Sequence, residues 1–390
     1  MRGVQLKISI RKNDIWLLFM IMSVMNVFSS LSICVEIVSI ALILMGSFSR
    51  GHLLRRNYYF YWMLLFLSYS ILSAGWSLNS ISVLYGCRGL IECLLIGLAV
   101  HAYLSDEINK ISFWKIYIFS ASILLLKIVI TTPLESIRVR VLSGGLNANV
   151  VGLELAIAVL SVFFLIKEKY IHSRKYLILL LFFCAGIVIS GSKKAIIALV
   201  VGVAMYKILY SRNILSTLGR IISLCIVIYI IYYLCMNVNE LYEIVGRRFE
   251  GMVKAFTLGK NYGDASTFER LTVVEYAIGM WKKNPIWGYG LNSFEQVAPF
   301  GIYTHCNYVE LLFGVGVLGT VLFYSLYVWM VKNVLKFFRT NKMFIFMFAC
   351  IVIFLISDIG YVSYGDVFYH LIIVFICEMI AKTQTYKKLN

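Results

Sequence analysis

Long apolar runs recur from one end of the chain to the other, and they constrain the fold more than any other feature. Of the 390 residues, 61% are hydrophobic and only 14% are charged, whereas a soluble chain carries roughly 25% charged residues. A run of about 20 apolar residues is long enough for a helix to cross a bilayer. The recurrence of such runs predicts an all-α polytopic membrane protein and not a globular domain with one anchor.

The spacing of these runs predicts about twelve membrane helices. We expect them at 15–31, 32–48, 58–76, 82–104, 111–131, 149–166, 176–190, 194–210, 221–236, 304–331, 344–357 and 367–381. The longest polar interruption falls between the ninth and tenth helices. The chain therefore divides into residues 1–236, a large loop with short helices at 237–303, and residues 304–390 with the last three helices and a tail.

The net charge of +17 comes mostly from Lys and Arg in short segments between apolar runs. Such segments lie preferentially in the cytoplasm. This rule places both termini in the cytoplasm and the large loop outside, so the charge requires no nucleic-acid partner. The nine cysteines are scattered without a CxxC spacing, which predicts neither a metal site nor a disulfide framework.

Several cations break the positive-inside rule, because this topology places them outside. Short loops near membrane ends normally avoid such charges on that side. A different role is therefore expected for them, and binding of an anion is the obvious one. The cations concerned are Arg138, Arg140, Lys193, Lys194, Arg247, Arg248 and Arg270.

Within the large loop, Ser266 and Glu269 have the spacing of a capping box, which predicts a helix starting at Ser266. Arg270 would then lie in the first turn, where unpaired backbone N–H groups already favour anions. Pro285 would end this helix, and glycines would turn the chain back to the membrane. The alternative is that Arg270 only pairs with Glu269 or with a lipid headgroup, and Arg247 and Arg248 could equally form a solvated face.

His305 starts the tenth predicted helix and is followed by Asn307 and Glu310. An imidazole at the membrane–water boundary can accept a proton near neutral pH. His305 is therefore the candidate catalytic base, together with Arg270 as the second catalytic residue. A histidine that merely faces headgroups is the alternative, and we prefer that interpretation for His370.

Further candidates for substrate binding come from other segments. Glycines at 144–145 let the backbone approach a ligand, and asparagines can bond sugar hydroxyls or phosphate oxygens. An arginine inside a membrane helix is a functional candidate by default. These binding candidates are Arg88, Arg138, Arg140, Asn147, Asn149, Lys193, Lys194 and Asn307.

The order of these residues resembles the signature domain of the O-antigen ligase and the O-antigen and capsular polysaccharide polymerase family. The likeness covers residues 138–320. It departs from the family where Ala148 replaces a proline between two asparagines and where Lys193 replaces an arginine. The matching positions are Arg270, Trp281, Asn284-Pro285, Gly288-Tyr289-Gly290, His305-x-Asn307-Tyr308-x-Glu310-Leu311-Leu312 and Gly316-x-x-Gly319.

The resemblance implies a metal-independent, inverting glycosyltransferase of the glycosyltransferase-C type, without a cofactor. It implies action on undecaprenyl-diphosphate-linked glycans at the outer face of the bacterial cytoplasmic membrane. By that resemblance Arg140 and Arg270 would bind the diphosphate, and His305 would assist the acceptor hydroxyl. Besides membrane lipid, a flippase and a chain-length regulator are implied partners.

The sequence leaves three activities open. A polymerase would join repeat units of a surface polysaccharide. A ligase would move the glycan onto lipid A core, protein or wall. A transporter for the lipid-linked sugar is less favoured, because charges deep in several helices would be expected, whereas here they cluster on one side.

Overall fold

The computed structural model describes residues 11–48, 57–105, 109–133, 135–136, 141–171, 173–211 and 213–389. Over these ranges the regular structure is helical, without β-strands. The all-α prediction is confirmed, and each predicted apolar helix has a counterpart. They are α1 (Lys12–Val24), α2 (Ser32–Phe48), α3 (Tyr58–Leu72), α4 (Ser80–Leu104), α5 (Asn109–Thr131), α7 (Ala148–Lys167), α8 (Ser173–Ser190), α9 (Lys193–Leu209), α10 (Ile214–Asn237), α15 (Asn307–Phe337), α16 (Met343–Ser357) and α17 (Val367–Leu389).

The first helix is shorter than expected. It ends at Val24 because Asn26 and Ser29 both have a φ of +53°, in the left-handed region that an α-helix cannot contain.

By length and composition, seven segments in the described ranges could cross a membrane, so the chain is a multi-pass membrane protein. The count of twelve spans and their orientation stay predictions, since α1, α3, α8, α9 and α16 are not among the seven segments. The seven segments are Ser29–Phe48, Ser80–Leu104, Lys110–Thr131, Ala148–Lys167, Leu215–Asn237, Asn307–Phe337 and Val367–Tyr386.

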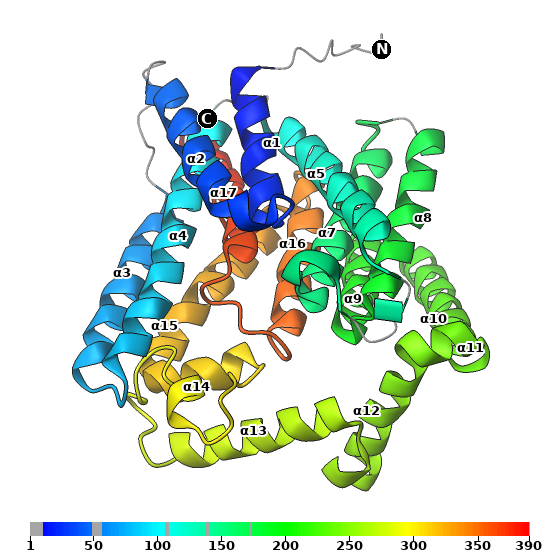
Figure 1. Ribbon diagram of the computed structural model, residues 1–390. Coiled ribbons are helices and arrows are strands. Elements are labelled where there is room, and N and C mark those ends of the chain that lie inside the picture. The colour runs from blue at the N-terminus through cyan, green and yellow to red at the C-terminus, as the bar shows by residue number, and fades with distance from the viewer. Residues whose placement is uncertain are drawn as a thin grey trace.

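The bundle is built around α7 and α17. α17 packs against α4, α7 packs against α8 and α9, and α9 packs against α16. In α7, 78% of the apolar span is buried within the protein, compared with 6% in α10. α10 therefore lies at the edge of the bundle (Figure 1), where its apolar side chains can contact lipid.

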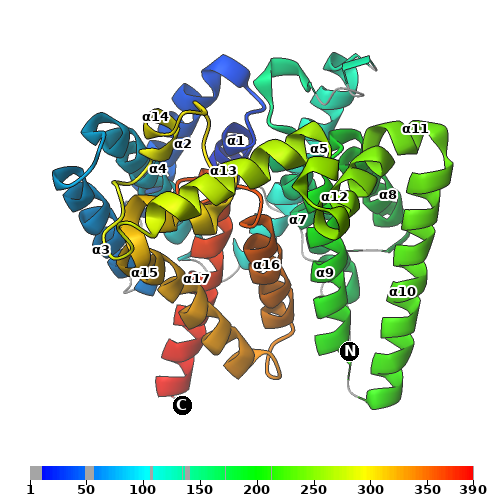
Figure 2. The ribbon, with the colours of Figure 1, turned by 90° about the horizontal axis from the view of Figure 1, so that it is seen from below.

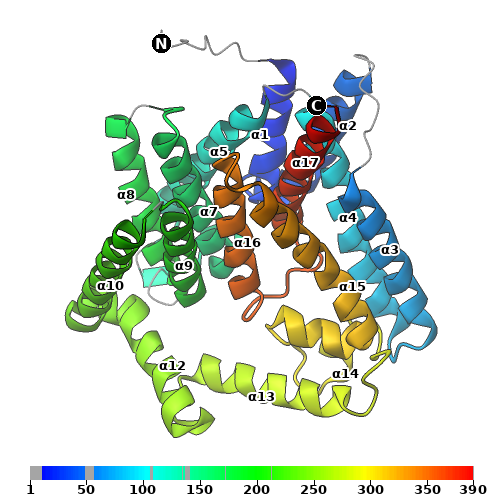
Figure 3. The ribbon, with the colours of Figure 1, turned by 180° about the vertical axis from the view of Figure 1, so that it is seen from behind.

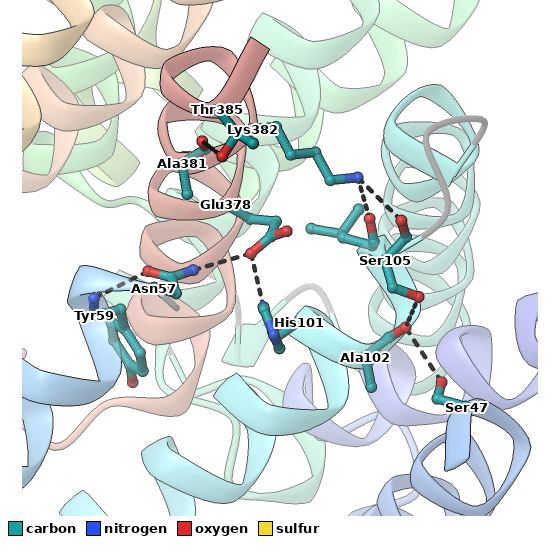
Figure 4. Close-up of polar contacts among 11 residues, drawn as sticks. Ser47, Asn57, Tyr59, His101, Ala102, Ser105, Glu378, Ala381, Lys382 and Thr385 are labelled. Carbon is teal, nitrogen blue, oxygen red and sulfur yellow. Dashed lines mark hydrogen bonds and ion pairs between the residues drawn. The ribbon is translucent and has the colours of Figure 1, made fainter. Parts of the chain in front are cut away.

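A buried polar cluster ties α3, α4 and α17 together near the end of α17 (Figure 4). Glu378 Oε2 accepts a hydrogen bond from Asn57 Nδ2 at 3.0 Å and lies 2.7 Å from His101 Nδ1. One turn later, Lys382 donates to the backbone carbonyl of Leu104. Buried polar groups are tolerated only when they are paired, and this cluster meets that requirement.

The segment between α10 and α15 forms short helices, as predicted for the large loop. They lie at the end of the bundle opposite to the start of α1 and the end of α17 (Figures 1 and 2). Figure 3 shows α13 running from the side of α10 and α12 to the side of α14 and α15. The helices are α11 (Asn239–Leu241), α12 (Arg247–Leu258), α13 (Ala265–Trp281) and α14 (Phe294–Val297).

A small apolar core of its own fixes this segment to the membrane helices. Val273 and Ala277 of α13 pack with Phe294 of α14 and with Val309 and Phe313 of α15, and all five are buried. The position of α13 is thus set by the first turns of α15.

The helix α15 is broken at Gly316, which has φ +65° and ψ −170°. The break frees carbonyl groups that the helix would otherwise bond. The carbonyl of Phe313 accepts from the N–H of Tyr289 at 2.8 Å, and that of Gly314 accepts from the N–H of Gly290 at 2.7 Å. At membrane depth such groups require partners from protein, and the loop supplies them.

The other side of the break is satisfied in the same way. The N–H of Val317 donates to the carbonyl of Pro285 at 2.9 Å. Asn284 Nδ2 donates to the carbonyl of Gly288 at 2.6 Å and closes the turn between them. A Cβ on Gly288 would lie 2.5 Å from the Phe313 carbonyl oxygen. The backbone of the Pro-x-x-Gly-x-Gly turn therefore supplies the hydrogen-bond partners that the break in α15 leaves without intrahelical bonds.

We predict that Gly288→Ala destabilises the protein. Its φ of +70° alone costs an L-residue about 1–2 kcal/mol, and the collision with Phe313 adds to this. The matched control is Gly279→Ala on the exposed side of α13, where a Cβ meets nothing within 4 Å and helix propensity favours alanine by about 1 kcal/mol. Thermal unfolding in detergent measures both. Equal unfolding temperatures for the two variants would contradict the close packing of the turn at Gly288 against α15.

Candidate functional site

The starts of α7, α9 and α13 meet α12 around a cavity of about 200 Å³, which we call the cationic cavity. Helix N-termini carry partial positive charge from unpaired N–H groups. Four cationic side chains add to it against one carboxylate, so the cavity suits an anion. It is lined by Asn149, Lys193, Lys194, Arg248, Asp264, Ser266 and Arg270.

The cap of α13 differs from the predicted one. Asp264 caps the helix, and its carboxylate accepts a hydrogen bond from the N–H of Thr267 at 2.8 Å. The predicted capping box of Ser266 and Glu269 is therefore wrong, because an aspartate two residues earlier already fills the role. Arg270 lies in the second turn as a result, not in the first.

Two of the cations hold the cavity together. Lys193 Nζ donates to the carbonyl of Arg248 at 2.9 Å and lies 3.4 Å from Asp264 Oδ2. Arg248 donates to the carbonyl of Gly191 at 3.4 Å. Burial alone would raise the pKa of Asp264, but the hydrogen bond from Thr267 and the charge of Lys193 lower it overall. These contacts join α12 and α13 to the turn between α8 and α9.

Arg270 is different from these two cations. It is half-buried in the cavity wall, and among the described residues its guanidinium has no hydrogen bond or ion pair. By contrast, the exposed Arg247 lies 3.6 Å from Glu243, one turn away on the outer surface. A half-buried guanidinium with unused donors is available to bind an anion.

His305 is held beside Arg270 and Lys194 by the loop that precedes α15. It has a φ of +57°, which is uncommon for a residue other than glycine. Glu310 shapes the loop by accepting a hydrogen bond from the N–H of Thr304 at 2.9 Å. Burial, followed by the charges of Arg270 and Lys194, lowers the pKa of His305 to about 4. The imidazole is therefore neutral at pH 7.

Asn307 is buried, and its amide is fully used. Its Nδ2 donates to the Tyr324 hydroxyl at 2.9 Å and to Asp358 Oδ2 at 3.3 Å. Its Oδ1 accepts from the N–H groups of Ser363 and Tyr364 at 3.0 and 3.1 Å. Both donors and both acceptor positions are occupied, which indicates that Asn307 positions the 358–366 loop instead of contacting substrate.

That loop lies directly against Lys194. Gly360 leaves room for the lysine side chain, because a Cβ there would collide with it. Asp358 supports the loop by accepting hydrogen bonds from Ser363 and Tyr324. No site residue was predicted in this stretch; its signal in the sequence is a polar, glycine-containing segment between two apolar helices.

The remaining predicted residues lie elsewhere. Asn147 caps α7 by accepting from the N–H of Asn149 at 2.9 Å, and it lines a different cavity. Arg88 lies within α4, as predicted, but its side chain is 63% exposed at the surface of the protein, and its Nε lies 3.1 Å from Glu92 on the next turn. Arg138 and Arg140 fall outside the described residues.

His370 is buried, and the expectation that it faces headgroups is wrong. Its Nδ1 lies 2.9 Å from the Tyr59 hydroxyl, and its Nε2 lies 2.9 Å from the carbonyl of Tyr364. With both ring nitrogens bonded inside the bundle, it cannot exchange protons with a substrate. Of the two predicted outer histidines, only His305 has a pKa that is lowered by cations of the cationic cavity, Arg270 and Lys194.

Comparison with known proteins gives one informative match. Residues 176–324 match a family model described as O-antigen ligase. Curated proteins gave no match. The matched range runs from the start of α8 into α15, and it includes Lys193, Lys194, Arg248, Arg270 and His305.

We predict that the pKa of His305 rises in Arg270→Ala, because one of the two cations that repel the protonated imidazole is removed. Burial should still hold it below the ordinary value of 6.5. Arg247→Ala is the matched control, since this arginine is exposed and already paired, and it should leave the pKa unchanged. Carbon NMR of histidine-labelled protein during a pH titration measures both, with the signal assigned from His305→Asn. Equal effects of the two variants would contradict the arrangement.

Proposed function

Through residues 176–324 the chain belongs to the O-antigen ligase family, and we propose that it is a bacterial surface polysaccharide polymerase. It would join undecaprenyl-diphosphate-linked oligosaccharide repeat units at the outer face of the cytoplasmic membrane. Family membership indicates glycosyl transfer of the ligase or polymerase kind. The observation that carries the proposal is Arg270, which lines the cationic cavity without a partner among the described residues, and which together with Lys194 lowers the pKa of His305 so that its imidazole is neutral.

The cationic cavity would hold the diphosphate of the lipid carrier. A diphosphate presents pairs of oxygens, and a guanidinium can bond two of them at once. Lys194, in the first turn of α9, adds a second charge. A cation at that position is opposed by the helix dipole, by about 0.3–1 kcal/mol. A bound anion would remove this unfavourable interaction, which supports anion binding there.

His305 would take the proton of the acceptor hydroxyl. The hydroxyl oxygen attacks the anomeric carbon, the bond from that carbon to the diphosphate oxygen breaks, and the diphosphate leaves with the electron pair. Arg270 and Lys194 stabilise the charge on the leaving group, and His305 receives the proton. These side chains supply both roles, so the proposed reaction requires no metal ion or cofactor.

Binding of the substrate would also raise the pKa of His305. The cations that lower the pKa of His305 would be neutralised by the diphosphate. Its pKa would therefore be higher in the complex than in the free protein, and the imidazole would become a better proton acceptor only when the leaving group is in place.

A ligase is the second candidate, because the matched family model is itself described as O-antigen ligase. The same cavity and histidine would serve, and only the acceptor would differ: lipid A core, protein or wall instead of a second repeat unit. A transporter is less favoured, because the cations lining the cavity gather at one end of the bundle. A flippase that delivers the substrate and a chain-length regulator are proposed partners.

We predict that Arg270→Lys clearly impairs turnover although the charge is kept, and that Arg270→Ala is worse. Loss of one charge-assisted contact at a developing charge costs roughly 10²–10³-fold in rate, and an ammonium cannot reproduce the two-pronged contact. The assay is conversion of purified lipid-linked repeat units by detergent-solubilised protein at matched expression. Arg247→Lys is the control. A wild-type rate for Arg270→Lys would indicate a headgroup anchor and remove Arg270 from the active site.

We predict that His305→Asn lowers the rate by about 10²–10⁴-fold, the usual contribution of general acid–base catalysis. Asparagine tolerates the left-handed backbone at this position, so this variant removes the imidazole and spares the loop, whereas His305→Ala also strains it. In the wild type, kcat/KM should fall at acid pH around the pKa of His305 in the free protein, about 4. The fall of kcat should occur at higher pH, because it reports the pKa of His305 in the substrate complex. If kcat/KM and kcat fell at the same acid pH, or if His305→Asn made polymer of full length in cells, the proton-transfer role would be ruled out.

A further inference from the structure

A second and larger cavity lies beside the cationic one. It measures about 510 Å³, within the range of about 300–1,000 Å³ that is typical of ligand sites, and we call it the polar cavity. The starts of α4, α7 and α17 surround it. Its polar lining residues include Glu92, Asn147, Glu154, Asn292, Tyr361 and Asp366.

Glu154 is the residue that points to a ligand. It lies on the second turn of α7, its side chain is buried at 1% exposure, and its Oε2 has no hydrogen-bond partner among the described residues. Burying a carboxyl group without a partner is costly, and such groups in native proteins call for an explanation. A ligand that donates a hydrogen bond would supply the missing partner.

The rest of the wall is held in place by protein contacts. Asp366 caps α17 by accepting from the N–H of Phe368 at 2.8 Å, and it also accepts from the Tyr361 hydroxyl. Asn292 accepts from the Tyr364 hydroxyl at 3.1 Å. The groups around Glu154 are therefore preorganised, which lowers the entropy lost on binding.

The polar cavity has the opposite chemistry to its neighbour. Its ionisable lining groups are carboxyl groups and tyrosines, joined by three asparagines. Carboxylates, amides and phenols accept hydrogen bonds and can hold hydroxyl groups. Its described lining includes no Lys, Arg or His that could pair with an acidic sugar, whereas an uncharged sugar rich in hydroxyls would find hydrogen-bond partners on several sides.

The first turn of α7 connects the two cavities. Asn147 lines the polar cavity, and Asn149, two residues later, lines the cationic one. A lipid-linked glycan also has two parts next to each other, because its first sugar is bonded directly to the diphosphate. The two cavities match these parts in order and in charge.

We propose that the polar cavity binds uncharged, hydroxyl-rich sugar residues of the lipid-linked glycan while the cationic cavity holds its diphosphate. This inference rests on the proposed function and names the chemical class of glycan that the site accepts.

Protection of single cysteines from a maleimide tests the proposal. Val362→Cys reports on the polar cavity and Ser266→Cys on the cationic one, since each residue lines its cavity. Thr383→Cys, at the opposite end of the bundle, is the control. Modification at each position is read by peptide mass spectrometry, which separates it from the native cysteines. Val150→Cys, also in the polar cavity, replaces Val362→Cys if that variant does not fold.

Two ligands are compared. One is lipid-linked oligosaccharide extracted from the cells that naturally make the protein, and the other is undecaprenyl diphosphate without sugars. We expect both to protect position 266, only the oligosaccharide to protect position 362, and neither to protect position 383. Glu154→Gln should raise the concentration needed to protect position 362 about tenfold and leave position 266 unchanged, because it replaces only the carboxylate. The protecting glycan should contain no acidic sugar.

The outcomes separate the two proposals. Protection of position 266 by both ligands without protection of position 362 would overturn the sugar site and leave the diphosphate site standing. Protection of position 362 by bare undecaprenyl diphosphate, or a protecting glycan with acidic sugars, would also overturn it. Failure of both ligands to protect position 266 would overturn the proposed function, and the sugar site with it.

Discussion

The break in α15 at Gly316 is the constraint on which the site depends. Inside a membrane protein, carbonyl and N–H groups released by a broken helix must be bonded by other protein groups. The turn at 285–290 does this on both sides of the break. It thereby helps to fix α13 against the first turns of α15, and Arg270 close enough to His305 to lower its pKa. A membrane helix without the break would leave the loop without an attachment of this kind.

The site combines two electrostatic environments within one turn of α7. On one side, cations and helix N-termini concentrate positive charge, and on the other, carboxyl groups and tyrosines present acceptors. The neutral state of His305 follows from its burial and from the cations beside it. The same charges that would stabilise a diphosphate therefore keep the base unprotonated before the substrate arrives.

Glu154 differs from the buried polar groups that join the helices of the bundle. Glu378 is equally buried, but Asn57 and His101 bond it. His370 is bonded through both ring nitrogens. These groups hold helices together, whereas Glu154 has a carboxyl oxygen without a partner in the described protein.

The sequence by itself determined the helical membrane class, because apolar runs of bilayer length have few other structures open to them. It also singled out Arg270, His305 and the lysine pair at 193–194 as candidate functional residues, since cations and histidines predicted on the outer side of the membrane can be recognised from the sequence. Only the tertiary structure decided which of them meet. Arg88 turned out exposed and Asn307 turned out fully bonded, because side-chain direction and pairing depend on distant helices. The polar cavity around Glu154 could not be predicted either, since it is formed by four helices that are far apart in the chain.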